Sequence, residues 1–374
     1  MNKNQEEWVS QVYEKILQKM NSERNRNHNI IPYVAENDRY VQDMSKKDIV
    51  WWTNGFWAGI MWQLFVATQD EAYRKTAILS EEKLDEAFNI YTGLHHDVGF
   101  MWLHTAVAHY RIEKDERSLA RGLHAAHLLA GRYNPNGKFI RSWNRNRSGW
   151  VIIDSMLNIP LLYWAGLVID DPRFVAIAKN HADTVMNTIV RPDGSVNHIV
   201  VFDPNTGEVL GYPAGQGYES GSSWTRGQAW AIYGFVLSYI HTGETKYLDT
   251  AKRVAHYFIA NVSLNHWQTN VDFRSPNEKN LMDSSAGACA ACGLIELSKN
   301  VSDLESELYL QAAINILQSI EQHDLDWNIS TDGLVKNATA AYHDENNQNA
   351  KIIYADYFFI EAIFKLKNTG FLIW

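Results

Sequence analysis

The stretch Val151–Ala165, V-I-I-D-S-M-L-N-I-P-L-L-Y-W-A, constrains the fold of this chain more than any other segment. It is apolar on nearly every side, and a helix of that kind belongs in a protein core. One carboxylic acid, Asp154, lies within it. Burial favours the neutral form of such a group, which is the form that a proton donor needs near neutral pH. The alternative is an Asp that caps a helix or pairs with a buried Arg, and Pro160 either kinks the helix or marks its true beginning.

The remainder of the chain also has mainly helical patterns. We expect helices near 5–21, 54–68, 71–90, 99–113, 116–133, 151–168, 171–190, 223–241, 246–262, 283–299, 303–323 and 352–367. Strand patterns are scarce: a hairpin over 196–202 and 208–212, and a short strand over 139–143. Twelve unequal helices make six pairs without a repeated sequence period, which suits a closed ring around a cavity. Composition alone leaves an open superhelix as the alternative, and we expect one domain over residues 1–374.

Composition narrows the class of protein. The chain has 374 residues, 46% of them apolar, and a net charge of −9, so nucleic acid is not an expected partner. The two cysteines, Cys289 and Cys292, exclude a disulfide scaffold and fit a reducing compartment. Their surroundings indicate a small-residue helix rather than a redox site. Because the sequence shows neither a signal peptide nor a membrane span, we expect a cytoplasmic protein.

A second acidic residue lies in G-L-H-H-D-V-G-F-M-W, where Asp97 follows His95 and His96. Helix capping explains an Asp at this position as well as catalysis does. Adjacent residues do not share a helix face, so we expect no metal site at the two histidines. Two carboxyl groups in aromatic surroundings nevertheless suggest acid/base chemistry on a sugar, and neither a metal nor another cofactor is expected.

Several polar residues around 198–230 are candidates for ligand contacts. The glycine-rich loop 211–223 lacks the spacing of a dinucleotide fingerprint, and we interpret it as a substrate-shaping loop that offers Gln216. Arg226 and Trp230 are four residues apart on one predicted helix face, which suits a sugar carboxylate and ring. They also suit a cation–π pair without a ligand. His198, on the predicted hairpin, is either a surface residue or a site residue.

Four motifs together resemble the unsaturated glucuronyl hydrolases, glycoside hydrolase family 88. They are H-H-D-V-G-F, I-I-D-S-M-L-N-I-P-L-L-Y-W-A-G, S-S-W-T-R-G-Q-A-W-A-I-Y-G-F and M-D-S-S-A-G-A-C-A-A-C-G-L-I-E-L. The resemblance extends from Trp51 to Tyr354 and beyond. It implies an all-α, (α/α)6 toroid of six helical hairpins with a few short strands. It also implies hydration of the C4=C5 bond in the terminal 4,5-unsaturated uronic acid of glycosaminoglycan oligosaccharides made by polysaccharide lyases.

The resemblance also assigns roles to residues of this chain. It implies that Asp154 is the general acid/base and that Asp97 is the second carboxylate of the site. The substrate-site positions that it implies are His96, Trp143, His198, Gln216, Arg226 and Trp230. In the variable segment Tyr342–Ile353, Asn346, Asn349 and Lys351 are candidates for a sulfate group, although a solvated polar loop is an equal explanation.

Three alternative functions fit parts of the same pattern. One is an unsaturated rhamnogalacturonyl hydrolase acting on pectin fragments, and a second is a sugar epimerase on an (α/α) toroid, which would need a pair of site histidines. The third is a glycan-binding helical protein without catalysis. In each case the expected partner is a carbohydrate, and we expect a monomer or weak dimer.

Overall fold

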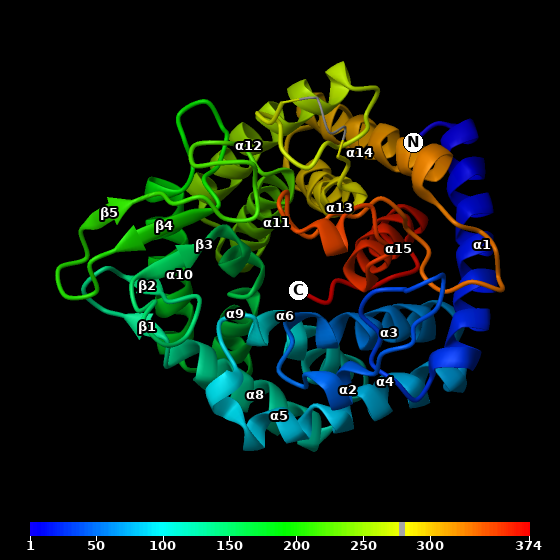
Figure 1. The fold of residues 1–374 in the computed structure, drawn as a ribbon, viewed down its shortest axis with the longest axis horizontal. Helices are drawn as coiled ribbons and strands as arrows, with labels where there is room; N and C mark the ends of the chain where they lie inside the picture. The colour runs from blue at the N-terminus through cyan, green and yellow to red at the C-terminus, as the bar shows by residue number, and fades with distance from the viewer. Residues whose placement is uncertain (277–280) are drawn as a thin grey trace.

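The helices of the chain form a closed ring with two layers, which the computed structural model shows for residues 1–276 and 281–374 (Figure 1). Outer and inner segments alternate along the described chain. The outer helices are α1 (Lys3–Asn27), α4 (Glu71–Lys83), α8 (Glu116–Ala130), α10 (Pro172–Thr188), α12 (Thr245–Leu264) and α14 (Asp303–Asp324). The inner helices are α3 (Phe56–Thr68), α6 (Val98–Trp102), α9 (Pro160–Val168), α11 (Thr225–Thr242), α13 (Ser284–Asn300) and α15 (Ile353–Lys367). The predicted (α/α)6 toroid is therefore confirmed.

Shorter elements complete the inner layer and the links. The α6 segment continues through a π-helical turn, Leu103–Val107, into α7 (Ala108–Glu113). Two short helices, α2 (Met44–Lys47) and α5 (Asp85–Asn89), lie in the connections. Single 3-10 turns cover Trp52–Gly55, Tyr91–Gly93, Ile153–Leu157 and Glu345–Asn347.

Burial explains why the two layers differ in sequence. The outer helices bury one face each, as in α10, where Phe174, Ala178, Ala182 and Val185 point inward. The inner helices are buried all round, and in α13 every residue from Ser284 to Ser298 is buried. Small residues allow this close packing.

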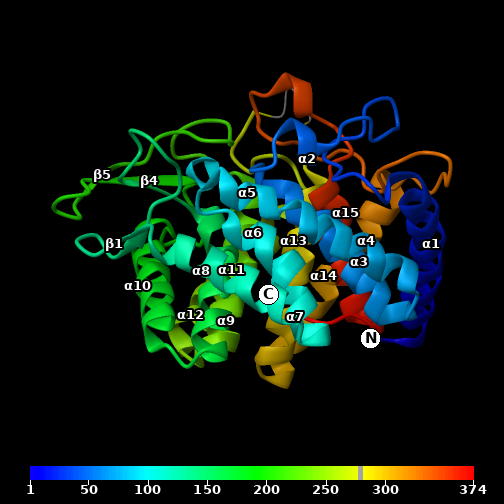
Figure 2. The same cartoon turned by 90° about the horizontal axis from the view of Figure 1, so that it is seen from below.

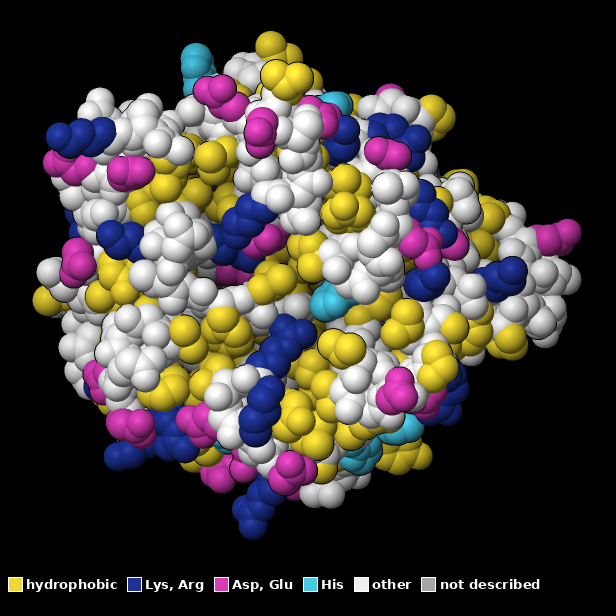
Figure 3. Space-filling model, turned by 180° about the vertical axis from the view of Figure 1, so that it is seen from behind, with side chains coloured by type: hydrophobic (Ala, Val, Ile, Leu, Met, Phe, Trp, Pro, Cys, Tyr) yellow, Lys and Arg dark blue, Asp and Glu magenta, His cyan; other side chains and the backbone are white. Residues whose placement is uncertain are grey.

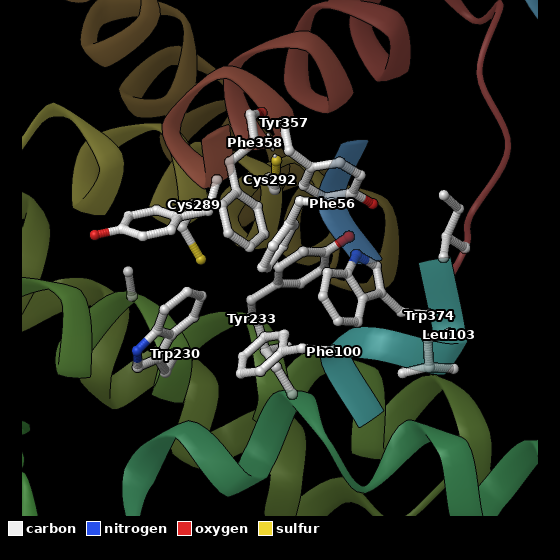
Figure 4. Close-up of a cluster of buried hydrophobic side chains, with 14 of the residues drawn as sticks. Phe56, Phe100, Leu103, Trp230, Tyr233, Cys289, Cys292, Tyr357, Phe358 and Trp374 are labelled. Atoms are coloured by element: carbon white, nitrogen blue, oxygen red, sulfur yellow. Dashed lines mark hydrogen bonds between the residues drawn. The ribbon is translucent and has the colours of Figure 1, made fainter. Parts of the chain in front are cut away.

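The centre of the ring is filled by side chains rather than open (Figure 4). Rings from α3, α6, α11 and α15 pack around the indole of Trp374, whose plane stacks on Phe358 at a centroid distance of 6.1 Å. Cys289 and Cys292 lie in the same cluster as buried free thiols, and burial raises their pKa well above the usual range. They are packing residues, which agrees with the interpretation from sequence.

The strands and long loops gather at one end of the ring, which we call the loop mouth (Figure 2). The strands β3 (Trp150–Ile152), β4 (Ile199–Phe202) and β5 (Val209–Gly211) form one antiparallel sheet there. The strands β1 (Tyr133–Asn134) and β2 (Phe139–Ile140) form another. The hairpin predicted over 196–212 is confirmed.

The opposite end of the ring has Lys and Arg side chains near its centre, as Figure 3 shows. Arg111 of α7 donates hydrogen bonds to the backbone carbonyls of Leu372, Ile373 and Trp374, which fixes the segment that enters the ring from this side. None of the described helices is long and apolar enough to cross a membrane.

One predicted helix was wrong in its first half. The sequence placed a helix over 151–168, but residues Trp150–Ile152 form strand β3 and Asp154 lies in the 3-10 turn that follows. The helix α9 begins at Pro160, because proline at the first helical position needs no hydrogen-bond partner for its missing N–H. The apolar run is thus buried throughout, as expected, but it supplies a turn to the loop mouth.

Candidate active site

Two buried carboxyl groups face the loop mouth from neighbouring inner segments. Asp97 belongs to the turn before α6, and Asp154 belongs to the 3-10 turn before α9; each residue is 8% exposed. Asn158 connects them, since its Nδ2 donates to Asp97 Oδ1 at 2.9 Å and to the Asp154 carbonyl at 3.2 Å. Its Oδ1 accepts from the Phe100 amide at 2.8 Å. The two predicted catalytic residues therefore belong to one hydrogen-bonded unit.

The environment of Asp97 favours its protonated form. Burial, followed by the nearby charge of Asp154, raises the pKa of Asp97 to about 8. The sequence argument for a protonated buried carboxyl was made for Asp154, and the structure shows the same cause acting on Asp97. Helix capping is also wrong for Asp97, because its side chain makes no hydrogen bond to the amides of α6. At neutral pH Asp97 is therefore protonated.

His198 lies against Asp154. Its Nε2 is 3.5 Å from Asp154 Oδ1, and its Nδ1 accepts a hydrogen bond from the Gln216 amide at 2.9 Å. In the neutral ring the proton is therefore on Nε2, the nitrogen that faces the carboxyl. A Cβ at Gly215 would lie 1.9 Å from His198 Nδ1, so only glycine permits this approach. Asp154 Oδ1 and His198 Nε2 have no hydrogen-bond partner among the described residues.

His95 and His96 flank Asp97 from the other side. His95 Nδ1 lies 3.3 Å from Asp97 Oδ2, and His96 Nε2 lies 3.3 Å from Asp97 Oδ1. Burial, with the charge of Arg132 nearby for both rings, lowers the pKa of His95 to about 4 and that of His96 well below its usual value. Both rings are neutral at pH 7. His96, predicted as a substrate-site residue, is fully buried.

Arg132 holds the loop that carries Trp143. The Arg132 guanidinium donates to the carbonyl oxygens of Arg141, Ser142 and Trp143 at 2.9–3.0 Å. The Trp143 ring is half-buried and lies 4.8 Å from the Arg147 guanidinium. A sugar contact at Trp143 stays a prediction, whereas the role of Arg132 in positioning it had no sequence signal, because one Arg after a glycine is common in turns.

Arg226 has partners within the protein that differ from those expected. It is 1% exposed and forms an ion pair with Asp283. It also donates to the carbonyl of Thr339 at 2.7 Å and to that of Ala340. Its guanidinium lies over the rings of Trp224 and Tyr354, at 4.6 and 5.2 Å, so the predicted pairing with Trp230 was wrong. Because its charge is matched by Asp283, Arg226 holds the 339–340 segment rather than presenting a free cation.

Trp230 lies in the central aromatic cluster (Figure 4). It is fully buried, and its ring centroid lies 5.4 Å from those of Phe100 and of Phe358. Its helix α11 is buried on nearly every side, so the sequence does not show which side faces the mouth. A substrate contact at Trp230 stays a prediction.

Gln216 holds the same segment as Arg226. Its Nε2 donates to the Ala340 carbonyl at 2.7 Å, and its own carbonyl accepts from the Tyr342 amide at 2.8 Å. The glycine-rich loop therefore joins the 339–342 segment at the loop mouth. A direct substrate contact by Gln216 stays a prediction.

Lys351 does not offer a free charge for a sulfate group. Its Nζ lies 2.6 Å from Asp38 Oδ1 and 2.5 Å from Asp326 Oδ2, and the residue is 8% exposed. Two carboxylates match its charge within the protein, and a substrate contact at Lys351 stays a prediction. Asn346 and Asn349 are exposed, and their proposed contact with sulfate stays untested.

Known proteins with the same architecture support a single family assignment. The sequence pattern of Glycosyl Hydrolase Family 88 matches residues 23–361. An unsaturated glucuronyl hydrolase from Bacillus sp. (strain GL1) is 34% identical over 359 residues, which cover 91% of this chain and 92% of that protein. An unsaturated chondroitin disaccharide hydrolase from Streptococcus pneumoniae is 29% identical over 98% of this chain and 94% of its own length.

Solved structures agree with this result. The crystal structure of the unsaturated glucuronyl hydrolase from Bacillus sp. GL1, described as responsible for the degradation of glycosaminoglycan, superposes with a TM-score of 0.91. Its sequence is 32% identical, and the match covers 97% of this chain and 98% of that one. An Asp-to-Asn variant of the Streptococcus agalactiae enzyme, complexed with dGlcA-GalNAc6S, has a TM-score of 0.85 at 28% identity, covering 99% and 94%. The chain belongs to Glycosyl Hydrolase Family 88.

Proposed function

We propose that this chain is an unsaturated glucuronyl hydrolase. It hydrates the C4=C5 enol-ether bond of a terminal 4,5-unsaturated uronic acid on glycosaminoglycan di- and oligosaccharides, and so separates that uronic acid from the neighbouring sugar. The observation that carries this proposal is that Asn158 donates hydrogen bonds to the buried Asp97 carboxyl and to the backbone carbonyl of Asp154, which holds the two acidic residues together at the loop mouth. Relatives named for unsaturated glucuronyl and chondroitin disaccharide hydrolysis support the substrate class.

The chemistry asks one group to give a proton and then to take another. A proton added to C4 leaves a cation shared between C5 and the ring oxygen. Water then adds its oxygen to C5 and returns a proton to the carboxylate. The hemiketal opens at the bond between C5 and the ring oxygen, and the hemiacetal left at C1 expels the neighbouring sugar. The net change is the addition of one water, and the catalyst is regenerated.

Asp154 is the group that we assign to this proton exchange. Its Oδ1 has no hydrogen-bond partner among the described residues and is therefore free to approach a substrate. His198 Nε2–H is positioned to stabilise the carboxylate that remains after the proton leaves.

Asp97 has a different role in this proposal. Because its pKa is about 8, it is protonated at neutral pH and donates a hydrogen bond to a substrate hydroxyl. A protonated neighbour also limits charge repulsion when a uronate binds near Asp154.

We further propose that the enzyme works in the cytoplasm as a monomer or weak dimer.

A side-by-side turnover assay tests the proposed function. The purified chain should consume the absorbance of unsaturated glycosaminoglycan disaccharides without added metal or nucleotide, and it should act more slowly on unsaturated pectin fragments. Turnover confined to the pectin fragments would contradict the substrate assignment. Interconversion of sugars without release of a neighbour, or binding without any turnover, would contradict hydrolysis itself. A panel of sulfated and unsulfated disaccharides then defines the substrate preference.

A further inference from the structure

His95, His96 and Asp97 form a compact group of metal-ligand side chains. Each offers one ligand atom, and these atoms lie within 4.8 Å of one another. The sequence argument against a metal at adjacent histidines assumed a helix, where neighbours point apart. Here the three residues precede α6, whose first residue is Val98, so that argument does not apply.

The contacts between the carboxylate and the two rings have the length found between ligands of a tetrahedral site. Zinc bonds to nitrogen and oxygen are about 2.0–2.2 Å long, so two ligands of a tetrahedral zinc are about 3.4 Å apart. The Asp97 carboxylate lies 3.3 Å from His95 Nδ1 through one oxygen and 3.3 Å from His96 Nε2 through the other. A cation that binds one Asp97 oxygen and both rings requires the carboxylate to turn, because the two contacts are made by different oxygens, and the ligand atoms must draw together from within 4.8 Å of one another.

Three ring nitrogens of the two histidines lack hydrogen-bond partners in the described part of the chain. His95 Nδ1 and both nitrogens of His96 are buried without a hydrogen bond among the described residues. His96 is fully buried. Buried polar atoms are rarely left without a partner, and a bound ion is one physical reason for such a group. This observation is independent of the distances and points to a ligand.

We propose that His95, His96 and Asp97 bind a zinc ion, with water as the fourth ligand, and that this zinc inhibits the enzyme. Two neutral imidazoles select zinc over magnesium or calcium, which prefer oxygen ligands. Inhibition follows because the metal displaces the proton of Asp97 and occupies its carboxylate, and this consequence rests on the proposed function. The Arg132 charge acts on both rings and opposes a cation, so the site is weaker than a structural zinc site.

Calorimetry of the full chain with zinc chloride tests the site directly. We expect one zinc per chain and at least about tenfold weaker binding after His95→Gln, because even the loss of an outer-shell partner costs about 10–100-fold in metal affinity. Asp97→Asn should weaken binding in the same way. His28→Gln is the matched control, since His28 is exposed at the end of α1 and should leave the affinity unchanged. Cobalt in place of zinc should give the visible absorption of a tetrahedral site.

Inhibition is then measured relative to the metal-free rate of each variant. Zinc should slow the wild type and His28→Gln, a chelator should restore the rate, and His95→Gln should need at least about tenfold more zinc. Absence of zinc binding, or wild-type affinity in both His95→Gln and Asp97→Asn, would overturn the proposal. If zinc binds at these residues but the wild type does not hydrolyse unsaturated uronides, the site stands and the proposed function fails.

Discussion

The centre of the ring and its loop mouth both bury charged side chains. Those compared in the centre are paired within the protein, whereas the two carboxyls at the mouth lack a cationic partner among the described residues. In the centre, Glu361 accepts hydrogen bonds from Tyr233 Oη at 2.7 Å and Trp374 Nε1 at 3.0 Å. Lys365 completes this group by pairing with Glu361 and Glu296. At the mouth, no Lys or Arg of the described chain forms an ion pair with Asp97 or Asp154, and Asp154 Oδ1 has no hydrogen-bond partner.

This difference separates stability from function. A buried charge that is fully paired within the protein has nothing left to offer a ligand, and its partners are needed for folding. A buried carboxyl without such partners destabilises the fold, and it persists where a ligand or reaction uses it. Substitutions in the centre should therefore reduce stability, whereas substitutions at the mouth should reduce turnover.

The largest expected effect is at Asp154. Asp154→Asn removes the proton exchange and should lower kcat by about 10²–10⁴-fold, the range of general acid–base catalysis. The melting temperature should stay within a few degrees of the wild type, because no hydrogen bond to the carboxyl is lost. Kinetics on an unsaturated disaccharide and thermal melts provide the two readouts. The exposed Asp303→Asn serves as control, and near-normal rates for Asp154→Asn would refute the assignment.

At Lys365 we expect the main effect on stability rather than on turnover. Lys365→Met leaves the Glu361 and Glu296 carboxylates without this cation, and breaking a buried pair costs about 3–5 kcal/mol of unfolding free energy. Denaturant unfolding measures the loss. Lys46→Met, at a side chain that is 84% exposed, should change stability by less than about 0.5 kcal/mol. A Lys365→Met protein as stable as the wild type would show that the comparison is mistaken.

Glu23 of α1 is a buried carboxyl away from the mouth, and its ionisation should make the stability of the fold depend on pH. Burial, followed by the nearby charge of Asp356, raises the pKa of Glu23 to about 8, and the Lys19 ammonium 3.4 Å away only partly offsets this. Because the folded pKa lies above the unfolded value of about 4.5, ionisation opposes folding. The stability associated with neutral Glu23 is complete below pH 4.5 and is lost as pH rises to about 8.

Glu23→Gln should remove this pH dependence. Relative to the wild type, the variant should gain about 1–3 kcal/mol of unfolding free energy between pH 5 and pH 8. Its turnover per folded molecule should be unchanged. Glu14→Gln, at an exposed position on the same helix, should follow the wild type across the range. A relative loss of stability with rising pH would contradict the sign of this argument.

The smallest expected effect is at His198. His198→Ala removes the Nε2–H that faces Asp154 and the acceptor for the Gln216 amide. We expect about a tenfold decrease in kcat/KM, equivalent to about 1.4 kcal/mol of transition-state stabilisation. His323→Ala, at an exposed histidine of α14, is the control for loss of an imidazole. An unchanged kcat/KM for His198→Ala would place this ring outside the reaction.

The sequence predicted the architecture well, because amphipathic and wholly apolar helices leave distinct patterns. Eleven of the twelve expected helices have a counterpart over most of their length, and Asp70, Asp171 and Gly243 mark helix ends as expected. The 151–168 segment failed because strand and helix are equally apolar when both are buried. That residues 1–374 form one domain stays a prediction.

The site was harder to predict, since it depends on which way buried side chains turn. The motif resemblance brought Asp97, Asp154 and His198 to one place. It did not show that Arg226 forms an ion pair with Asp283, or that Lys351 forms ion pairs with Asp38 and Asp326, because such partners come from distant segments. Asn158 was missed although it stands as a polar residue in the same apolar run as Asp154, and that pattern offered a usable signal.

The position of the oxygen taken from water tests the central claim most directly. The reaction is run with an unsaturated disaccharide in heavy-oxygen water, and the products are trapped at once by borohydride reduction and fragmented in a mass spectrometer. Hydration of the double bond predicts heavy oxygen at C5 of the former uronic acid and the original ring oxygen at C1. Heavy oxygen at C1 would show direct cleavage of the glycosidic bond and would contradict the account.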